Sequence, residues 1–176
     1  MKNSVLLINI FIFVLLSSVL MSCSRDTLDI GDIAPDFNLE NQENDEIRLS
    51  NYKGKFVILV FYGRTDNNST IEHLTNIESD YSKYIGLGAA VIGINHEREE
   101  IIRNVHRRLR LSFDLLSDRE KKTIKAYRVS GGFGSAKRVT FIIDPSGIIR
   151  SVIEEDDTED HRQEILNELR NLTQGG

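Results

Sequence analysis

The chain has 176 residues, a formal net charge of −5 at pH 7 and 40% hydrophobic residues. This length suits one globular domain with a short terminal segment, and the mildly acidic balance gives no general attraction to nucleic acid. Cys23 is the only cysteine, so no disulfide forms within the chain.

The first 22 residues have the pattern of a secretory signal. Lys2 precedes an apolar run from residue 5 to 20, and no other charged residue occurs before Arg25. A positive start, an apolar core and small residues near its end are typical of a cleaved leader. An uncleaved membrane helix is the alternative, but the run is short for the ~20 residues that a span needs, and Asn9 interrupts it.

The four residues Leu20-Met21-Ser22-Cys23 resemble the bacterial lipobox. That resemblance implies that Cys23 carries lipid, starts the mature chain and anchors the protein in a membrane, since several acyl chains give stable binding. The implied location is the cell envelope, facing the periplasm or the exterior. Ser24 implies sorting to the outer membrane if the cell is Gram-negative. Removal of residues 1–22 leaves a charge of −6.

Three segments follow from this interpretation: a lipoprotein signal peptide over 1–22, a tether over 23–30 and one domain over 31–176. Within the domain, the run 56–62 is continuous and mostly β-branched or aromatic, which predicts a strand buried on both faces. The run 89–94 predicts a second such strand.

Two further strands are predicted over 139–143 and 148–152. They flank Asp144-Pro145-Ser146-Gly147, whose proline and glycine positions suit a tight turn. We therefore expect these two strands to form an antiparallel hairpin.

Four helices are predicted between and after the strands. One begins near Ser69 and another at Ser117, where Glu72 and Glu120 three residues later complete capping boxes. The predicted inward-facing residues of the four helices, in chain order, are Ile71, Leu74, Tyr81 and Ile85; Ile101, Ile102, Val105 and Leu109; Ile124 and Tyr127; and Ile165, Leu166, Leu169 and Leu172.

The second and last helices are expected over 97–109 and 160–172. Strands alternate with helices, and the chain closes with a hairpin and a helix. This order indicates an α/β sandwich with a mixed sheet.

Four motifs then occur in a familiar order. Segments 31–37, 49–55, 115–118 and 138–144 are similar to GDxAPDF, LSDYKGK, LLSD and RxTFxID of peroxiredoxins. The chain resembles the alkyl hydroperoxide reductase and thiol-specific antioxidant type, and within it the bacterioferritin-comigratory-protein-like branch. The resemblance implies a thioredoxin-like fold of the peroxiredoxin type, with a mixed sheet flanked by helices.

The chain departs from this family at the reactive residue. The family loop after Phe-Tyr reads Pro-x-x-x-Thr-x-x-Cys, and alignment on residues 61–62 puts Gly63, Asn67 and Thr70 at those places. A shift of one residue puts Ser69 at the cysteine place instead. Neither hydroxyl has an accessible anion at neutral pH or a sulfenic state through which to cycle.

Arg138 matches the family arginine that steadies thiolate and peroxide. Gly63, Asn67 and Arg138 therefore define a degenerate pocket, with helix N–H groups at Ser69 or Thr70 as anion donors. The alternative is that Arg138 is a half-exposed residue at a strand end with local partners, which is the common state of arginine.

Metal and cofactor signatures are poorly supported. His73, His96, His106 and His161 have no cysteine or second histidine at helical spacing, so we predict no metal and no cofactor. The glycine-rich segment 130–135 lacks the ending of a phosphate loop.

Two charged runs have ordinary interpretations. The basic cluster over 103–110 contacts anionic headgroups or, more simply, forms a solvated helix face. The acidic run over 154–160 lacks the ligand spacing of a calcium loop and favours the positive end of the following helix.

The leading hypothesis is an envelope lipoprotein with a redoxin domain that lacks the peroxidatic cysteine. It would bind or scaffold an unknown envelope protein or small ligand. The alternative is an antioxidant, thiol-peroxidase-like oxidoreductase that uses an unrecognised residue or the thiol of a partner.

Overall fold

The computed structural model describes residues 27–132, 135–154 and 161–174. The predicted signal peptide, Cys23 and most of the acidic run lie outside the described residues. No helix in the described part of the chain is both long and apolar enough to cross a membrane.

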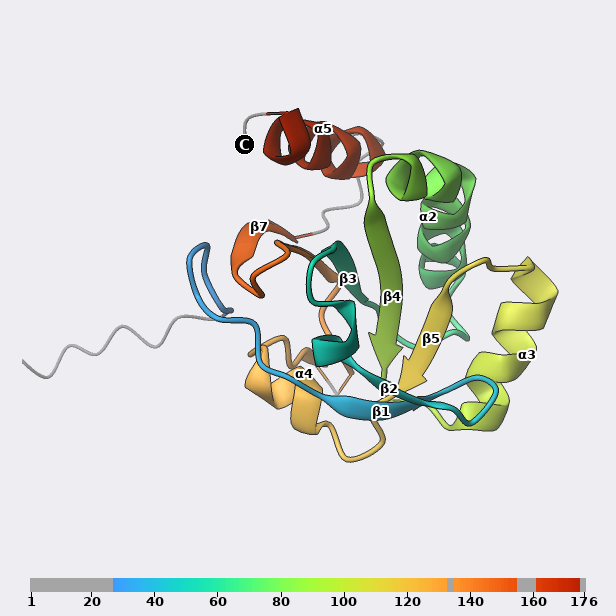
Figure 1. Cartoon of the computed structure of the whole chain (residues 1–176). Helices are drawn as coiled ribbons and strands as arrows, with labels where there is room; N and C mark the ends of the chain where they lie inside the picture. The colour runs from blue at the N-terminus through green and yellow to red at the C-terminus, as the bar shows by residue number, and fades with distance from the viewer. Residues whose placement is uncertain (1–26, 133–134, 155–160, 175–176) are drawn as a thin grey trace, which may run out of the picture.

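One seven-stranded sheet, of order β2-β1-β5-β4-β3-β6-β7, organises the domain (Figure 1). The strands are β1 Asn38–Asn41, β2 Glu46–Arg48, β3 Phe56–Phe61, β4 Ala89–Asn95, β5 Asp114–Ser117, β6 Val139–Ile143 and β7 Ile149–Glu154. The central strands β3, β4 and β5 are parallel, and the pairings outside them are antiparallel. The predicted mixed sheet is confirmed.

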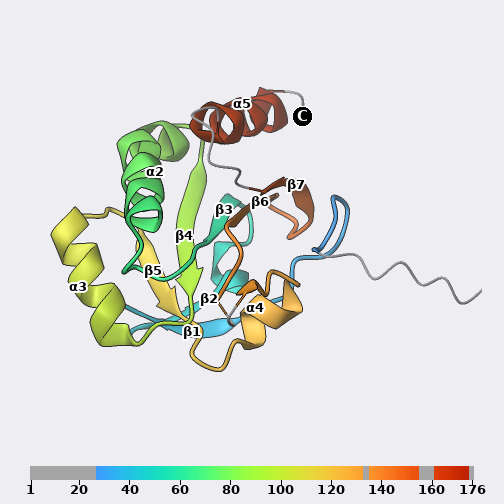
Figure 2. The ribbon, with the colours of Figure 1, turned by 180° about the vertical axis from the view of Figure 1, so that it is seen from behind.

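Helices cover both faces of this sheet (Figures 1 and 2). They are η1 Leu49–Tyr52, α2 Asn68–Gly86, α3 Glu99–Leu109, α4 Lys122–Ala126 and α5 His161–Gln174. Helices α2, α3 and α5 pack into one apolar cluster, whereas α4, η1 and the segment before β1 pack into the other.

Strand β3 divides its side chains between the two clusters. Val57, Leu59 and Phe61 face the α4 side, and Ile58 and Val60 face the α2 side, because successive side chains of a strand point to opposite faces. All five are at most 2% exposed. The strand predicted to be buried on both faces is confirmed.

Three aromatic rings fill the core on the α4 side. Phe61 lies 5.1 Å from Tyr127 and 5.8 Å from Phe141, measured between ring centroids. The Tyr127 hydroxyl donates a hydrogen bond to the Pro35 carbonyl at 2.9 Å. This bond ties α4 to the segment before β1.

The two predicted capping boxes are wrong. Helix α2 begins at Asn68, and the Asn67 side chain caps it by accepting the Ser69 N–H. Ser117 ends strand β5, a strand that sequence reasoning missed. The buried Asp118 carboxylate accepts the N–H groups at the start of α4, from Lys122 and Ile124.

Two predicted inward-facing residues lie outward. Ile85 and Ile101 are exposed, because the buried stripe of α2 runs through Ile77 and Tyr84 and that of α3 runs through Ile102 and Val105. The stripe of α5 is confirmed, with Ile165, Leu166 and Leu169 buried.

The β6–β7 hairpin forms as predicted. Its turn is held by the buried Asp144 carboxylate, which accepts hydrogen bonds from Ser146, from the Ile148 N–H and from Arg150. Burial alone would raise the pKa of Asp144, but these hydrogen bonds outweigh it and lower the pKa from 3.8 to about 2.

The register of β3 with β6 shows which features lie at each end of β3. Val57 pairs with Ile143, and Phe61 pairs with Val139. The β6–β7 turn therefore lies at the amino end of β3, whereas the chain from Tyr62 into α2 leaves the carboxyl end. Six residues of strand put roughly 20 Å between the two ends.

We expect Gly93→Ala to destabilise the domain by about 1–2 kcal/mol, because an added methyl overpacks a filled core. A Cβ on Gly93 would lie 2.8 Å from Leu115 Cδ2 and 3.1 Å from Tyr62 Cε1. The free energy of unfolding in urea measures the effect. Gly86→Ala, in open space at the end of α2, is the matched control and should be neutral or slightly stabilising.

Acid should weaken the β6–β7 turn. Because the folded-state pKa of Asp144 lies below that of the unfolded chain, its contribution is complete above pH 4 and disappears as pH falls toward 2. We expect Asp144→Asn to lower the free energy of unfolding at pH 7 by about 2 kcal/mol, and less at pH 3. Asp66→Asn, at an exposed carboxylate, should leave the pH curve close to that of the unchanged protein. A constant Asp144→Asn deficit from pH 3 to 7 would contradict this assignment.

Candidate functional site

A short loop over residues 63–67 connects β3 to α2 and carries most of the predicted site. Its last residue, Asn67, accepts hydrogen bonds from the Ser69 N–H at 3.0 Å and the Ser69 hydroxyl at 3.1 Å. The Ser69 N–H is therefore occupied within the chain. It is not the free anion donor that the sequence suggested.

Thr70 and Ser69 have different surroundings in the first turn of α2. Thr70 is 2% exposed, and its hydroxyl lies against Gly63, within 3.4 Å of where a Cβ on that glycine would be. Ser69 is half-buried and takes part in the cap. Of the two, Thr70 directs its side chain toward the loop that leaves β3.

The structure brings the predicted pocket residues together. Gly63, Asn67, Ser69, Thr70 and Arg138 line one hollow of about 400 Å³ at the carboxyl end of β3. Arg64, Asp66 and residues 131–132 and 135–137 complete the described part of its lining. Segments far apart in sequence therefore meet at the helix start, as the family alignment required.

Positive charge predominates around this hollow. Arg64, Lys137 and Arg138 line it, together with the single carboxylate of Asp66. Arg64 and Asp66 form an exposed ion pair at 2.7 Å. Arg138 is half-buried and has a further contact within the chain, which agrees with the interpretation that it has local partners.

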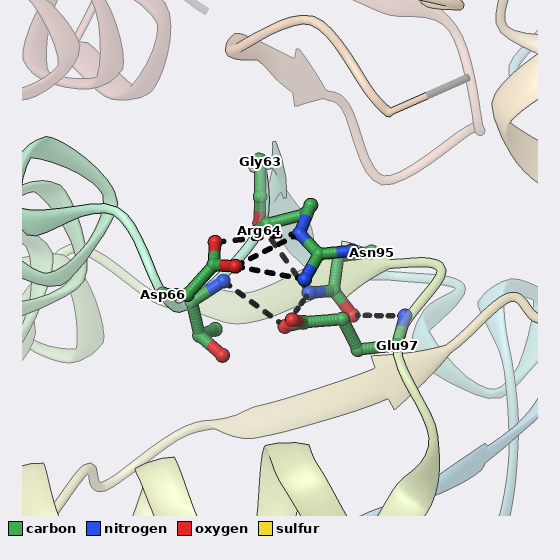
Figure 3. Close-up of polar contacts among 6 residues, drawn as sticks. Gly63, Arg64, Asp66, Asn95 and Glu97 are labelled. Atoms are coloured by element: carbon green, nitrogen blue, oxygen red, sulfur yellow. Dashed lines mark hydrogen bonds and ion pairs between the residues drawn. The ribbon is translucent and has the colours of Figure 1, made fainter. Parts of the chain in front are cut away.

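A buried carboxylate fixes the loop from the neighbouring strand (Figure 3). Glu97 Oε2 accepts the Thr65 N–H at 3.1 Å and the Asn95 side-chain N–H at 2.8 Å. Asn95 Nδ2 also lies 3.4 Å from the Gly63 carbonyl, and Asn95 Oδ1 accepts the Glu97 N–H at 3.1 Å. We call this set of bonds the Asn95–Glu97 latch.

The latch joins the ends of two parallel strands. Asn95 is the last residue of β4, and Glu97 follows it before α3 begins. The Ser117 hydroxyl at the end of β5 donates to the Glu97 carbonyl at 2.7 Å. The carboxyl ends of β3, β4 and β5 are thus connected by hydrogen bonds.

Two ionisable groups near the latch are held neutral. Burial raises the pKa of the Tyr62 hydroxyl well above its usual value, and the Glu97 carboxylate raises it further. Burial and the charge of Lys121 lower the pKa of His96. Tyr62 is therefore a phenol at neutral pH, with no hydrogen-bond partner among the residues that the structure describes.

The other charged candidates are placed as follows. His73 is buried in α2, and the side chain of His161 lies outside the described part of the chain. Within residues 27–132, 135–154 and 161–174, no three His, Cys, Asp or Glu side chains are grouped as metal ligands. In the basic cluster, Arg103 bonds the Gln42 carbonyl at 2.6 Å and the Asn44 side chain at 2.9 Å.

Sequence reasoning missed the latch, although a signal for it exists. Asn95-His96-Glu97 directly follows a predicted buried strand, as Gly63 and Thr65 follow another. Since the carboxyl ends of neighbouring parallel strands meet at one edge of a sheet, polar residues there are expected to contact one another.

We expect Glu97→Ala to lower the free energy of unfolding by about 1–3 kcal/mol, because two buried donors lose their acceptor. Hydrogen exchange at the Thr65 amide should accelerate relative to amides in β3. Asp66→Ala is the matched control, since it removes an exposed ion-pair partner from the same loop and should change stability little. Unchanged exchange at Thr65 would show that the latch does not hold the loop.

Comparisons with known proteins agree with this geometry. The AhpC/TSA family model matches residues 30–152. A chloroplastic peroxiredoxin Q from Triticum aestivum is 32% identical over 145 residues, covering 81% of this chain and 67% of that protein. Peroxiredoxin Bcp from Bacillus subtilis is 27% identical over 155 residues, covering 84% of this chain and 99% of that protein.

A solved structure shows the same fold. Peroxidoxin BcpB from Mycobacterium tuberculosis superposes with a TM-score of 0.77 at 24% identity, covering 82% of this chain and 98% of that one. The overall fold of this chain is thus shared with a solved peroxidoxin structure. The chain belongs to the AhpC/TSA family of peroxiredoxins, and its relatives place it with the bacterioferritin-comigratory-protein-like members.

Proposed function

We propose that this protein is an envelope lipoprotein whose peroxiredoxin-like domain does not reduce peroxides with a thiol of its own, and that it acts as a binding or scaffolding module. The observation that carries the proposal is the place of Thr70. It lies in the first turn of the helix after β3, with its buried side chain against Gly63. Alignment on residues 61–62 puts the family's cysteine at that place, and a shift of one residue puts it at Ser69 instead.

A threonine there cannot carry out the family reaction. A cysteine thiolate attacks the peroxide oxygen, becomes a sulfenic acid and is then restored by a second thiol. A hydroxyl near neutral pH has no comparable anion and no sulfenic state. Ser69 offers no substitute, because it is also a hydroxyl and already bonds Asn67.

Sulfur is absent from the whole chain after Cys23. The two methionines are Met1 and Met21, and the chain has no tryptophan. The side chains that oxidants attack most readily, cysteine and methionine, are therefore missing from residues 24–176. A domain of this composition would tolerate peroxide without consuming it.

The hollow beside Thr70 is the best-supported place for a ligand or partner. It lies at a helix start with Arg64 and Lys137 in its lining, so it suits a small anion or an acidic segment of an envelope protein. The Asn95–Glu97 latch keeps the loop in shape without any contribution from sulfur. Lipid at Cys23 would hold the module at a membrane.

The alternative function is antioxidant oxidoreduction that uses an unrecognised residue or the thiol of a partner. It is favoured by the relatives, which are named peroxiredoxins. The two functions differ in one measurable respect. Only the alternative produces peroxide turnover.

We expect the mature lipidated protein to consume no hydrogen peroxide above the buffer rate, with either a thioredoxin or a glutathione reducing system. Thr70→Cys should gain a thiol whose pKa is depressed by the helix start, and a sulfenic acid should form on it. Trapping of the sulfenic acid, followed by mass spectrometry, measures that gain.

Ser69→Cys is the matched control, one residue away and turned into the cap. It should react with peroxide more slowly than Thr70→Cys. Turnover by the unchanged lipidated protein would contradict the proposal and support the alternative. The mass of the N-terminal peptide independently reports whether Cys23 carries lipid.

A further inference from the structure

A turn before β1 presents two isoleucines to solvent. Ile30 is 66% exposed and Ile33 is 77% exposed, against 45% for Ile85 and 41% for Ile101. Large aliphatic side chains this exposed and only three residues apart are unusual on a soluble surface, and such groups mark contact sites. We call Ile30, Ile33 and the turn over residues 29–32 the isoleucine tip.

The isoleucine tip is rigidly held. The Asp32 N–H donates to the Asp29 carbonyl at 3.1 Å across the turn, and Gly31 has the positive φ of 95° that this turn requires. Asp32 Oδ2 also accepts the Asp29 N–H at 3.0 Å. Ile30 is thus fixed at the apex of a closed turn.

Both sides of the turn are joined to the domain. The Gly31 N–H donates to the Ile149 carbonyl at 2.8 Å, and the Ala34 N–H donates to the Gly147 carbonyl at 2.9 Å. Leu28 precedes the turn and is buried in the α4-side core, although the sequence placed it in the tether. These hydrogen bonds and the buried Leu28 fix the turn on the domain, so the side chains of Ile30 and Ile33 stay exposed to solvent.

A mainly apolar groove lies beside Ile33. Its volume is about 370 Å³, and Ile33, Tyr52 and Val57 contribute to its lining. The exposed side chains of Lys53 and Lys55 also border it. Lysines beside an apolar surface can extend their ammonium groups to the headgroups of a bilayer while their stems stay on that surface.

The tip lies close to the predicted anchor. Ile30 is seven positions after Cys23, and that stretch spans at most about 25 Å when fully extended. Any contact between the tip and the anchored membrane would then be intramolecular, with a high effective concentration. At this end Asp29, Asp32 and Asp36 slightly outnumber Lys53 and Lys55, while Asp144 is paired with Arg150. With no excess of positive charge, apolar insertion and not phosphate binding is the fitting interaction.

We propose that the isoleucine tip inserts into the interfacial layer of the bilayer that holds the lipid anchor, and so orients the domain on that membrane. The proposed binding partner of the tip is therefore the lipid surface itself. This inference rests on the lipid anchor at Cys23 that is part of the proposed function. The acyl chains on Cys23 would already give stable attachment, so the contribution of the tip is to orient the domain.

Helix α3, on the other side of the domain, provides a control position for testing this proposal. The blue loop before β1 and helix α3 lie at opposite lateral edges of the domain in both views (Figures 1 and 2). Ile101 on α3 is an exposed isoleucine far from the tip. The absence of tryptophan from the chain makes any introduced tryptophan a single reporter.

The test uses the full lipidated protein in phosphatidylcholine vesicles, with and without brominated acyl chains. We expect the tryptophan of Ile33→Trp and of Ile30→Trp to show blue-shifted fluorescence on vesicles without bromine. On brominated vesicles, most of that fluorescence intensity should be quenched. Ile101→Trp should keep the emission of an exposed indole in both. Co-sedimentation with the vesicles is measured for each variant.

The possible outcomes distinguish failure of the tip proposal from failure of the lipid anchor. Sedimentation with no quenching at residues 30 and 33 overturns the tip proposal and leaves the anchor intact. Equal quenching at residue 101 also overturns it, because the domain then has no fixed orientation. A blue shift without quenching identifies a protein surface as the occupant and overturns it too. Failure of all variants to sediment rejects the anchor and this inference together.

Discussion

The burial of β3 on both faces is the constraint on which the rest of the molecule depends. Its side chains alternate between two cores, and its backbone pairs with β4 on one side and β6 on the other. A strand so enclosed cannot shift by one residue without moving every side chain to the wrong core. Its carboxyl end, and therefore the start of α2, is fixed by the same packing.

The site keeps its shape through polar contacts and not through a reactive group. The Glu97 carboxylate can be buried because two protein donors, Thr65 and Asn95, replace the hydrogen bonds that water would give it. Neither contact involves Thr70 or Ser69, the two residues that the alternative alignments put at the family cysteine position. The hollow can therefore keep its shape with hydroxyl side chains at both places, which is what a binding role requires.

Much of the fold was predictable from sequence, and the failures have physical causes. Runs such as 56–62 are long and apolar enough to define a strand alone, and the motifs gave the topology. The capping boxes failed because Asn67 and Asp118 compete with serine as caps, and side-chain oxygens of all these types accept helix N–H groups. Strands β1, β2 and β5 have only three or four residues, too few for a clear period. The predicted pocket residues do line one hollow. The latch was missed because the bonds that tie it to the loop join residues 32 positions apart.

The pairing of β3 with β6 has a consequence for access. The turn next to Ile33 lies at the amino end of β3, and the hollow beside Thr70 lies at the carboxyl end. If the isoleucines contact the bilayer, the hollow at the opposite end of β3 would therefore face away from the membrane. Whatever enters it would arrive from the aqueous side, as a diffusing solute or the arm of another envelope protein, without first partitioning into the membrane.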